Sequence, residues 1–576
     1  MRRWARFTCG PFWTCVWAGR AAAPPRCAPL PKKPPCWCKF RGAFSGEHGD
    51  GLCRGEWIAW QFGPRLNDAL RAIKNEFDPT GLFNPGKIID PPKMDDASLL
   101  RFAPPGTPKP YRRIDLKPWL DWSAWNVQAD PVSEIATAPG TGGDSTGGLA
   151  KAAEMCNNNG HCRKFDTGTM CPSYRVTRDE QHLTRGRANS LRLALSGQLG
   201  PEGFTSQALF DTLDLCVGCK GCKRECPTGV DMPQMKTEFL AHYKARHGHT
   251  LRDRLVAHLP DYAALASRVP WLANLRDALP GAARLSESLL GLAAERVLPR
   301  WRRDTFWRQH ERQHFAGAQE TLAAAHAGRK AALLFVDTFN GSFESENAHA
   351  AARVLKAAGY TLHTLTPKGG HLCCGRTFLA GGMVDKAKAK AGALIDALLP
   401  FARAGCPIVG LEPSCLLTLR DEALVMGLGE RAEVVSRQAL LFEELLARDV
   451  RSGLTTLNLG AAGAPILLHG HCHQKAFDAV TPVMDVLRLI PQARPELVET
   501  SCCGMAGSFG YEARHYAVSM QMAELSLLPA LRKQPGAIVV ADGTSCRYQI
   551  AHGVKREAIH VARLLDRLLL PARPQG

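Results

Sequence analysis

The spacing of apolar residues divides the chain into a helical part and an alternating part. A helical period runs from Trp57 to Phe77, and a second helical stretch covers roughly 185–215. Residues 246–328 keep a helical period that prolines interrupt. From residue 329 onward, short apolar runs alternate with amphipathic stretches, which predicts strands between helices.

The alternating part predicts α/β architecture with parallel sheets, so the whole chain is expected to be a multidomain α+β and α/β protein. Amphipathic helices are expected at Glu346–Ala358 and Lys386–Ala402. The expected strands are Ala331–Val336, Thr361–Leu365, Ile408–Leu411, Ile466–His469, Leu497–Glu499 and Ile538–Ala541.

A cysteine pattern occurs twice in this part: a Cys-Cys-Gly triplet followed, after a nearly equal interval, by a single cysteine. Matching motifs at equal intervals indicate a duplicated unit, so we expect cysteine-rich repeats at 329–455 and 456–576. The matching positions are Cys373, Cys374, Gly375 and Cys415 in the first repeat, and Cys502, Cys503, Gly504 and Cys546 in the second.

Composition sets the other boundaries. Residues 1–40 mix Trp, Cys, Pro and Arg without periodicity, and we expect an atypical, unstructured segment rather than a signal peptide. Residues 41–92 contain a helix that ends in a turn, and 93–150, rich in Pro, Gly and Trp, are expected to be a linker. A cysteine module at 151–245 and a helical connector at 246–328 follow.

Composition also narrows the class of protein. The chain of 576 residues has 21 cysteines, and their clustered spacing indicates metal ligation in a reducing compartment, which predicts a cytoplasmic location. No apolar run reaches the length of about eighteen residues that a transmembrane helix needs. The net charge of +18 does not predict nucleic-acid binding, because residues 1–41 hold half of the excess and no basic stripe is interleaved with aromatics.

One aromatic segment of the connector has two interpretations. Trp301, Phe306 and Trp307 stand beside several arginines, a composition that suits peripheral contact with a membrane surface, for example the inner membrane. The alternative is an ordinary helix packed on the next domain, which we favour.

The strongest chemical signal is the run Cys216, Cys219, Cys222 and Cys226-Pro227. It has the C-x2-C-x2-C-x3-C-P spacing of bacterial ferredoxins, which hold a [4Fe–4S] cluster. Glycines between these cysteines let the backbone close around a cluster. A structural zinc site is the alternative, but zinc ribbons usually separate two C-x2-C pairs.

The fourth cysteine of such a run serves the other cluster of a pair, so a partner motif is expected nearby. Cys156, Cys162 and Cys171-Pro172 lie upstream. If each motif gives its last cysteine to the cluster of the other, Cys171 would join Cys216, Cys219 and Cys222 at the first cluster.

The second cluster would then hold Cys226 with Cys156 and Cys162, which leaves one iron without a thiolate. That site is either three-iron, or four-iron with an oxygen or nitrogen ligand such as Asn159 or His161, or empty.

Four cysteines of the repeats directly follow predicted strands. Ligand sites of parallel α/β sheets form at the carboxyl ends of strands, so these cysteines and Cys503 are predicted to converge on one metal centre. Cys53 and Cys406 have no such context and are expected to be inert. The four strand-end cysteines are Cys415, Cys472, Cys502 and Cys546.

Three resemblances follow one another along the chain. Ser45–Gly51, with its Gly-Glu-His-Gly run, and Asp78–Lys87 resemble the C-terminal end of the FAD-linked oxidase domain of D-2-hydroxy-acid dehydrogenases. Residues 151–245 resemble the ferredoxin-type 4Fe-4S domain fused to some of those enzymes. Residues 331–550 resemble the tandem cysteine-rich repeat of heterodisulfide reductase B subunits and of the small subunit of anaerobic glycerol-3-phosphate dehydrogenase. The order over about 41–565 resembles that of large bacterial FAD and iron–sulfur D-2-hydroxyglutarate dehydrogenases.

The resemblance implies site residues near the start of the chain. Glu47 and His48 are implied to be catalytic: a metal ligand, and a second ligand or the base that takes the substrate's hydroxyl proton. Gly46, Gly49 and Asn84 are implied cofactor contacts. Because residues 1–40 leave no room for the family's FAD-binding domain, FAD is expected in the parent enzymes but not in this chain alone.

The repeats depart from the complete family pattern. Asp337–Asn340 stand where the first repeat would carry an early cysteine, and Gly543 stands where the second would begin its late C-x2-C pair. A further metal centre in the repeats is therefore an open expectation. Its candidate ligands are Cys373, Cys374, Cys415, Cys472, Cys502, Cys503 and Cys546.

The resemblance implies the iron–sulfur electron-transfer part of a flavin-dependent D-2-hydroxy-acid dehydrogenase of the 2-hydroxyglutarate, lactate or glycolate type. It would pass electrons from reduced FAD to a downstream acceptor, and alone it would be an incomplete enzyme. The alternative is a standalone iron–sulfur carrier subunit that docks on a separate flavoprotein and feeds quinone. The implied partners are a flavoprotein domain or subunit and an acceptor, either quinone or an electron carrier.

Overall fold

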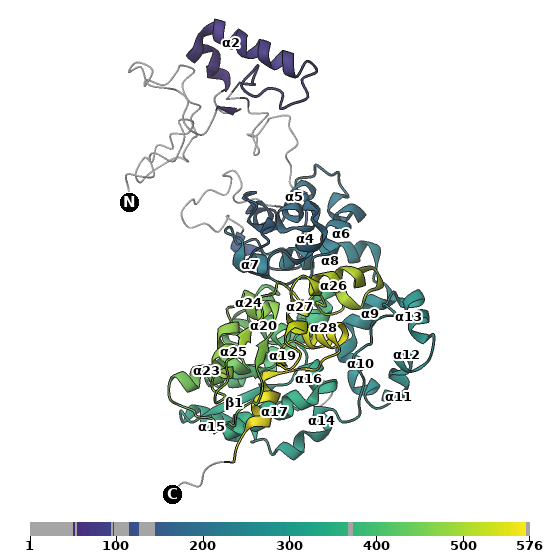
Figure 1. The fold of residues 1–576 in the computed structure, drawn as a ribbon, viewed down its shortest axis with the longest axis vertical. Coiled ribbons are helices and arrows are strands. Elements are labelled where there is room, and N and C mark those ends of the chain that lie inside the picture. Colours follow the sequence, from purple (N-terminus) through teal and green to yellow (C-terminus); the bar gives the residue numbers. More distant parts are fainter. Residues whose placement is uncertain are drawn as a thin grey trace. The chain divides into compact units, whose positions relative to one another are not determined.

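The computed structural model describes residues 50–51, 55–93, 96, 114–125, 145–366 and 372–571 (Figure 1). The chain forms two compact units. The first comprises residues 1–112 with 131–142, and the second comprises 113–130 with 143–576. The functional cysteines that the structure describes belong to the second unit.

The described part of the first unit is a helix followed by a turn. A 3-10 turn, η3 (Gly55–Trp57), leads into α2 (Ile58–Phe77), which is kinked at Gly63, where φ is +79°. The helix ends at Asp78, whose carboxylate accepts hydrogen bonds from the backbone N–H groups of Leu82 and Phe83 at 2.8 and 2.9 Å. This Asp cap closes the turn that the sequence predicts after the helix.

The second unit begins with a helical module around the ferredoxin-type cysteines. Residues 114–125, assigned to a linker from the sequence, pack on this module, because the buried carboxylate of Glu238 accepts hydrogen bonds from the backbone N–H groups of Trp119 and Leu120 and from Trp122 Nε1. The module helices are α3 (Leu149–Glu154), α4 (Pro172–Thr177), α5 (Thr184–Leu195), α6 (Gln207–Asp214), α7 (Gly221–Glu225) and α8 (Met232–His247).

The connector is a series of short helices that prolines and glycines separate. Its aromatic segment packs on the first repeat: Phe306 is fully buried, and Trp301 contacts Phe343 with ring centroids 4.6 Å apart. This is the packing expected of an ordinary helix. The helices are α9 (Leu251–Ala257), α10 (Leu259–Ala266), α11 (Pro270–Ala273), α12 (Leu275–Ala278), α13 (Ala282–Leu290), α14 (Phe306–Gln309) and α15 (Ala318–His326).

Each cysteine-rich repeat holds a four-stranded parallel sheet, and the two sheets have equivalent strand orders, β2-β1-β3-β4 and β6-β5-β7-β8. Leu333 pairs with Ile408 in the first sheet, and Leu467 pairs with Val539 at the equivalent place in the second. The parallel α/β architecture is confirmed. The strands are β1 (Ala331–Phe335), β2 (Thr361–Thr364), β3 (Ile408–Gly410), β4 (Ala439–Leu441), β5 (Ile466–Leu468), β6 (Glu496–Leu497), β7 (Ile538–Val540) and β8 (Ala558–Ile559).

The two repeats share a hydrophobic core that includes residues of both sheets and of helices α17 and α29. The first repeat has α16 (Thr338–Ser342), α17 (Ser345–Ala357), α18 (Arg376–Ala380), α19 (Val384–Arg403), α20 (Pro413–Leu419), α21 (Glu422–Val425), α22 (Glu430–Gln438) and α23 (Phe442–Arg451). The second has α24 (Cys472–Ala476), α25 (Val480–Leu487), α26 (Ala513–Glu524), α27 (Leu527–Lys533), α28 (Thr544–Val554) and α29 (Val561–Leu568). Among the described residues, none of the helices has the length and apolar character needed to cross a bilayer.

Candidate metal centres

The C-x2-C-x2-C segment forms a tight loop between α6 and α7. Its backbone takes the left-handed conformation at Gly218 and at Lys220, with φ of +61° and +60°. Gly221 has no room for a side chain, because an added Cβ would lie 3.0 Å from Thr169 Cβ and 3.2 Å from the backbone nitrogen of Met170. The glycine therefore allows the loop to approach the segment that carries Cys171.

Cys171 joins this loop from the start of α4. A small cavity is lined by the four cysteines of the predicted exchange, Cys171, Cys216, Cys219 and Cys222. The guanidinium of the buried Arg187 lies beside them, with Nη1 3.6 Å from Cys171 Sγ. The structure thus brings together the four residues predicted to hold the first cluster.

The donor set of this cavity fits a [4Fe–4S] cluster. Burial raises the pKa of Cys219 and of Cys222 well above the ordinary value, with neighbouring thiols adding to it at Cys219, and Asp231 and then Cys216 adding to it at Cys222. Thiolates held together in a dry cavity repel one another, so a bound cationic centre is needed to keep them deprotonated. The remaining wall is mostly apolar and includes Val217, Met170 and Met232, which suits a water-excluded cluster.

The second ferredoxin site is less complete. Burial, followed by the nearby thiols of Cys171 and Cys156, raises the pKa of Cys162 to about 11. Cys226 is half-buried, and its Sγ lies 3.4 Å from Thr228 Oγ1. The structure therefore brings Cys162 near Cys156, whereas the place of Cys226 at this site remains a prediction.

The structure places beside Cys156 a side chain that the sequence analysis did not select. Asn158 Oδ1 lies 4.0 Å from Cys156 Sγ and accepts a hydrogen bond from Asn189 Nδ2 at 2.9 Å. Asn159 and His161, the expected candidates, are exposed, as Asn158 is, and Asn159 Oδ1 accepts the backbone N–H of His161. A signal was available in the sequence, because asparagine is the residue other than glycine that most readily takes a left-handed turn, and Asn158 has φ of +63°.

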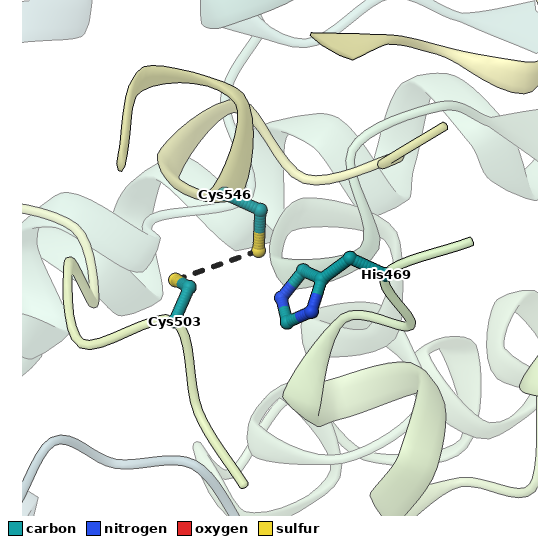
Figure 2. Close-up of side chains that lie close together, drawn as sticks. All are labelled: His469, Cys503 and Cys546. Carbon is teal, nitrogen blue, oxygen red and sulfur yellow. Dashed lines mark hydrogen bonds between the residues drawn. The ribbon is translucent and has the colours of Figure 1, made fainter. Parts of the chain in front are cut away.

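The second repeat gathers four cysteines and a histidine at the carboxyl end of its sheet. The Sγ atoms of Cys503 and Cys546 are 3.5 Å apart, and Figure 2 shows the imidazole of His469 directed toward them. The ligand atoms of these three residues all lie within 4.8 Å of one another. Cys502 contacts both Cys503 and Cys472, and this hydrogen bond to Cys472 lowers the pKa of Cys472 to about 6. His469 is a further residue that the sequence analysis missed.

The first repeat gathers three cysteines with oxygen donors. Cys374 lies beside both Cys373 and Cys415, and the side chain of Thr338 lies near Cys373. Although the hydrogen bond with Cys374 acts in the opposite direction, burial raises the pKa of Cys415 to about 12. Burial and then Glu412 raise the pKa of Asp337 to about 6. Asp337 caps α16 as His471 caps α24 in the second repeat, and it lies near enough to Cys415 to raise the pKa of that thiol.

The strand-end cysteines therefore do not share one centre. The structure divides them between two sites, because Cys415 lies with Cys374 in the first repeat, whereas Cys546 lies with Cys503 in the second. Each repeat has its own sheet, and each group of cysteines follows strands of its own sheet, although the loops of the two sheets meet where Glu412 accepts the backbone N–H of Thr544 at 2.8 Å. Cys406 is buried apart from both sites, with its Sγ 3.9 Å from the carbonyl oxygen of Pro407.

The ferredoxin-type loop is seated against both repeats. On the second repeat, His473 Nε2 donates a hydrogen bond to the Gly218 carbonyl at 3.0 Å, and the Cys219 thiol lies close enough to Cys472 for that thiol to raise its pKa. On the first repeat, the buried Lys220 forms ion pairs with Asp421 and Glu422, the latter at 2.7 Å.

A separate group, formed by Glu443, Asp542 and His560, lies buried where the repeats meet. His560 Nε2 donates to the carbonyl of Leu411 at 3.1 Å, and its Nδ1 accepts the backbone N–H of Ala562 at 3.0 Å. Both ring nitrogens are therefore occupied, which leaves the imidazole no lone pair for a metal.

The expected flavin-side residues fall largely outside the described part of the chain. Gly46, Glu47, His48, Gly49 and Cys53 all lie there. Asn84 is described: it is exposed, in a left-handed turn with φ of +46°, and its Oδ1 accepts a hydrogen bond from Lys87 Nζ at 3.4 Å.

Comparison with known families identifies the same modules. Residues 37–88 match FAD linked oxidases, C-terminal domain; residues 152–230 match the 4Fe-4S dicluster domain; and residues 336–420 match the cysteine-rich domain. The three expected modules are present, in the expected order.

The similar curated proteins fall into two groups. D-2-hydroxyglutarate dehydrogenase of Escherichia coli (strain K12) is 28% identical over 554 residues, which cover 89% of this chain and 50% of that protein. The C subunit of anaerobic glycerol-3-phosphate dehydrogenase from the same strain is 25% identical over 65% of this chain and 92% of that protein. The probable glycolate oxidase iron-sulfur subunit of Bacillus subtilis (strain 168) is 24% identical over 69% of this chain and 90% of that protein. The chain spans about half the length of the D-2-hydroxyglutarate dehydrogenases that it matches.

Proposed function

We propose that this chain is the iron–sulfur electron-transfer part of a flavin-dependent D-2-hydroxy-acid dehydrogenase. The observation that carries the proposal is the cavity that Cys171, Cys216, Cys219 and Cys222 line together. A [4Fe–4S] cluster held in this cavity would accept electrons one at a time, which a flavin that has been reduced by hydride requires of its electron acceptor.

The residues around the cavity favour electron transfer from the ferredoxin-type loop toward the second repeat. Arg187 places a buried positive charge beside Cys171, and the ion-paired Lys220 fixes the loop on the first repeat. Cys219 and Cys472 belong to adjacent sites, so an electron that leaves the loop has a short path into the second repeat. The four thiolates and the imidazole of that repeat are the better-equipped receiving site, because the first repeat offers three thiolates and oxygen donors.

The enzymatic half of the proposal rests on the N-terminal module and on the relatives. In it, Glu47 and His48 would be a metal ligand and a second ligand or the base that takes the substrate's hydroxyl proton, while Gly46, Gly49 and Asn84 would contact the flavin. The match to the C-terminal domain of FAD linked oxidases and the relatives named D-2-hydroxyglutarate dehydrogenase support this assignment. The compartment that we propose is the cytoplasm, since the described cysteines are free thiols.

One observation favours the second candidate, a carrier subunit that docks on a separate flavoprotein and feeds quinone. The similarity covers 92% of the C subunit of anaerobic glycerol-3-phosphate dehydrogenase and 90% of the glycolate oxidase iron-sulfur subunit. It therefore spans nearly the whole of two proteins that are named as subunits.

Anaerobic purification of the full chain tests both candidates. We expect iron and acid-labile sulfide, no flavin absorbance, and no dye reduction by D-2-hydroxyglutarate until a flavoprotein is added. Colourless protein without iron would refute the proposal. Dye reduction by the chain alone would instead show that its flavin site is complete.

A further inference from the structure

The helices α9 to α13 lie together at one edge of the second unit (Figure 1). Several of their large apolar side chains are exposed. We call residues 251–300 the apolar lobe. Leu289 is 72% exposed and Trp271 is 65% exposed, which is unusual for large apolar residues of a packed domain. The other exposed large apolar side chains of the lobe are Leu251, Leu255, Leu265, Val269, Leu272, Leu279, Leu285 and Val297.

These side chains form faces rather than isolated positions. Residues four apart lie on the same side of a helix, and the exposed pair Leu285 and Leu289 has this spacing in α13, as Leu251 and Leu255 do in α9. The side of α9 that faces the protein carries the buried Ala257. A helix of a globular protein normally turns its apolar face inward, so the orientation of these helices is inverted.

The polar contacts of the lobe hold it in this inverted orientation. Arg296 is buried and donates from Nε to the carbonyl of Gly510 at 2.9 Å, and Arg252 forms an ion pair with Glu512 at 3.1 Å. Asp261 pairs with Lys390 of the first repeat at 2.5 Å. Because charged side chains, among them the buried Arg296, anchor the inner surface to both repeats, the apolar faces cannot turn inward without breaking these contacts.

The charges left exposed on the lobe are mostly positive. Arg254, Arg268, Arg284 and Arg300 are exposed and form no ion pair within the described part of the chain. Most acidic side chains of the lobe already have a partner within the protein: Asp277 pairs with Arg276, and Glu287 accepts the backbone N–H of Ala294 at 2.6 Å. An apolar surface edged by unpaired arginines and carrying an exposed Trp is complementary to lipid chains below an anionic headgroup layer.

We propose that the apolar lobe binds the surface of an anionic lipid bilayer, with its leucines and Trp271 among the acyl chains and its arginines at the lipid phosphates. A second copy of the chain suits this surface poorly, because pairing two lobes would bring the unpaired arginines together. The inference does not rest on the proposed function, since binding to lipid requires no substrate, flavin or reduction.

Vesicle flotation of the full chain tests the proposal. Wild-type protein is expected to float with vesicles of phosphatidylcholine and phosphatidylglycerol, and roughly tenfold less with phosphatidylcholine alone. The double variant Leu285→Ser and Leu289→Ser is expected to lower partitioning by about tenfold or more. The triple variant Arg268→Gln, Arg284→Gln and Arg300→Gln is expected to abolish the preference for phosphatidylglycerol and the sensitivity to salt.

Leu454→Ser with Leu525→Ser is the matched control, because these exposed leucines lie outside the lobe, and it is expected to bind like the wild type. Circular dichroism and iron content show whether each variant is folded. Absence of wild-type flotation, or wild-type flotation of the Leu285→Ser and Leu289→Ser variant, overturns the proposal. The proposal also fails if the wild type does not float with vesicles but instead forms a dimer, or a complex with a purified flavoprotein, that the Leu285→Ser and Leu289→Ser variant cannot form. The lobe would then bind a protein rather than lipid.

Discussion

His473 Nε2 donates a hydrogen bond to the backbone carbonyl of Gly218, at 3.0 Å. The imidazole belongs to α24 of the second repeat, one residue after Cys472, and the carbonyl belongs to the loop between Cys216 and Cys219. One hydrogen bond therefore joins the two candidate metal sites that lie next to each other. Together with the Lys220 ion pairs on the first repeat, it makes the ferredoxin-type loop part of one rigid assembly.

Loss of Lys220 should destabilise this assembly. Lys220→Met removes the most buried partner of Asp421 and one of the two basic partners of Glu422, which keeps Arg376, and we expect a cost of about 3 kcal/mol. Lys223 also pairs with Asp421 but is partly exposed, so Lys223→Met should cost less than about 1 kcal/mol. Thermal unfolding of the anaerobic proteins measures both; equal midpoints for the two variants would contradict the assigned burial.

Cys171 should hold a cluster, whereas Cys406 should not. Both thiols are buried, but only Cys171 lines the cavity with the C-x2-C-x2-C loop. Cys171→Ser is expected to remove about four irons per chain, the content of one cluster. Cys406→Ser should keep the wild-type iron content. Iron and sulfide analysis decides the matter, and a full iron complement in Cys171→Ser would refute the exchange of fourth ligands.

Asn158 should determine the state of the second ferredoxin site. Its Oδ1 is held beside Cys156 by Asn189, whereas the side chain of Asn159 is used within the turn. In Asn158→Gly the backbone keeps its left-handed turn but the oxygen is lost, so we expect the signal of an oxidised three-iron cluster in EPR spectra. Asn159→Ala should lack that signal. Identical spectra from the two variants would argue against Asn158 as a ligand.

Gly504 and Gly507 provide a matched pair in the second repeat. Both have positive φ, but an added Cβ at Gly504 would lie 2.2 Å from the carbonyl oxygen of Ser519, whereas nothing lies within 4 Å of one at Gly507. Gly507→Ala should therefore cost about 1–2 kcal/mol of backbone strain. Gly504→Ala should cost considerably more and disturb the site at Cys502 and Cys503. Thermal midpoints and iron content test this, and similar losses in both variants would exclude the steric explanation.

Glu443 should make stability depend on pH. Burial and then the nearby Asp542 raise the pKa of Glu443 well above its ordinary value of 4.5, and neither of its carboxylate oxygens has a hydrogen-bond partner among the described residues. Above pH 4.5 the unfolded state releases this proton while the folded state keeps it, so stability falls as the pH rises toward the folded pKa.

Glu443→Gln removes that titration. We expect the variant to match the wild type near pH 4.5 and to gain up to about 1.4 kcal/mol per pH unit above it, until the folded pKa is reached. Unfolding midpoints of both proteins across this range provide the measurement. A difference that stays constant with pH would mean that Glu443 is ionised in the folded protein.

The residue pattern alone was sufficient for the architecture of the repeats. Apolar runs of strand length predicted six of the eight described strands. The second Cys-Cys-Gly triplet predicted the duplication, which the matching strand orders confirm. The strands β4 and β8 were missed because no isolated apolar run marks them: β4 lies directly between α22 and α23, and a single residue separates β8 from α29. The packing of 114–125 was also missed, because it depends on Glu238, more than a hundred residues away.

The identity of the ferredoxin-type cysteines was determined by sequence, because ligand spacing within one loop is a local property of the backbone. Which cysteines share a site in the repeats was decided only by the tertiary structure. Cys415 and Cys546 both follow strands, yet two separate sheets carry them to different edges. His469, Asn158 and the outward leucines of the lobe were likewise hidden, because a side chain's neighbours across the fold depend on contacts that no local pattern encodes.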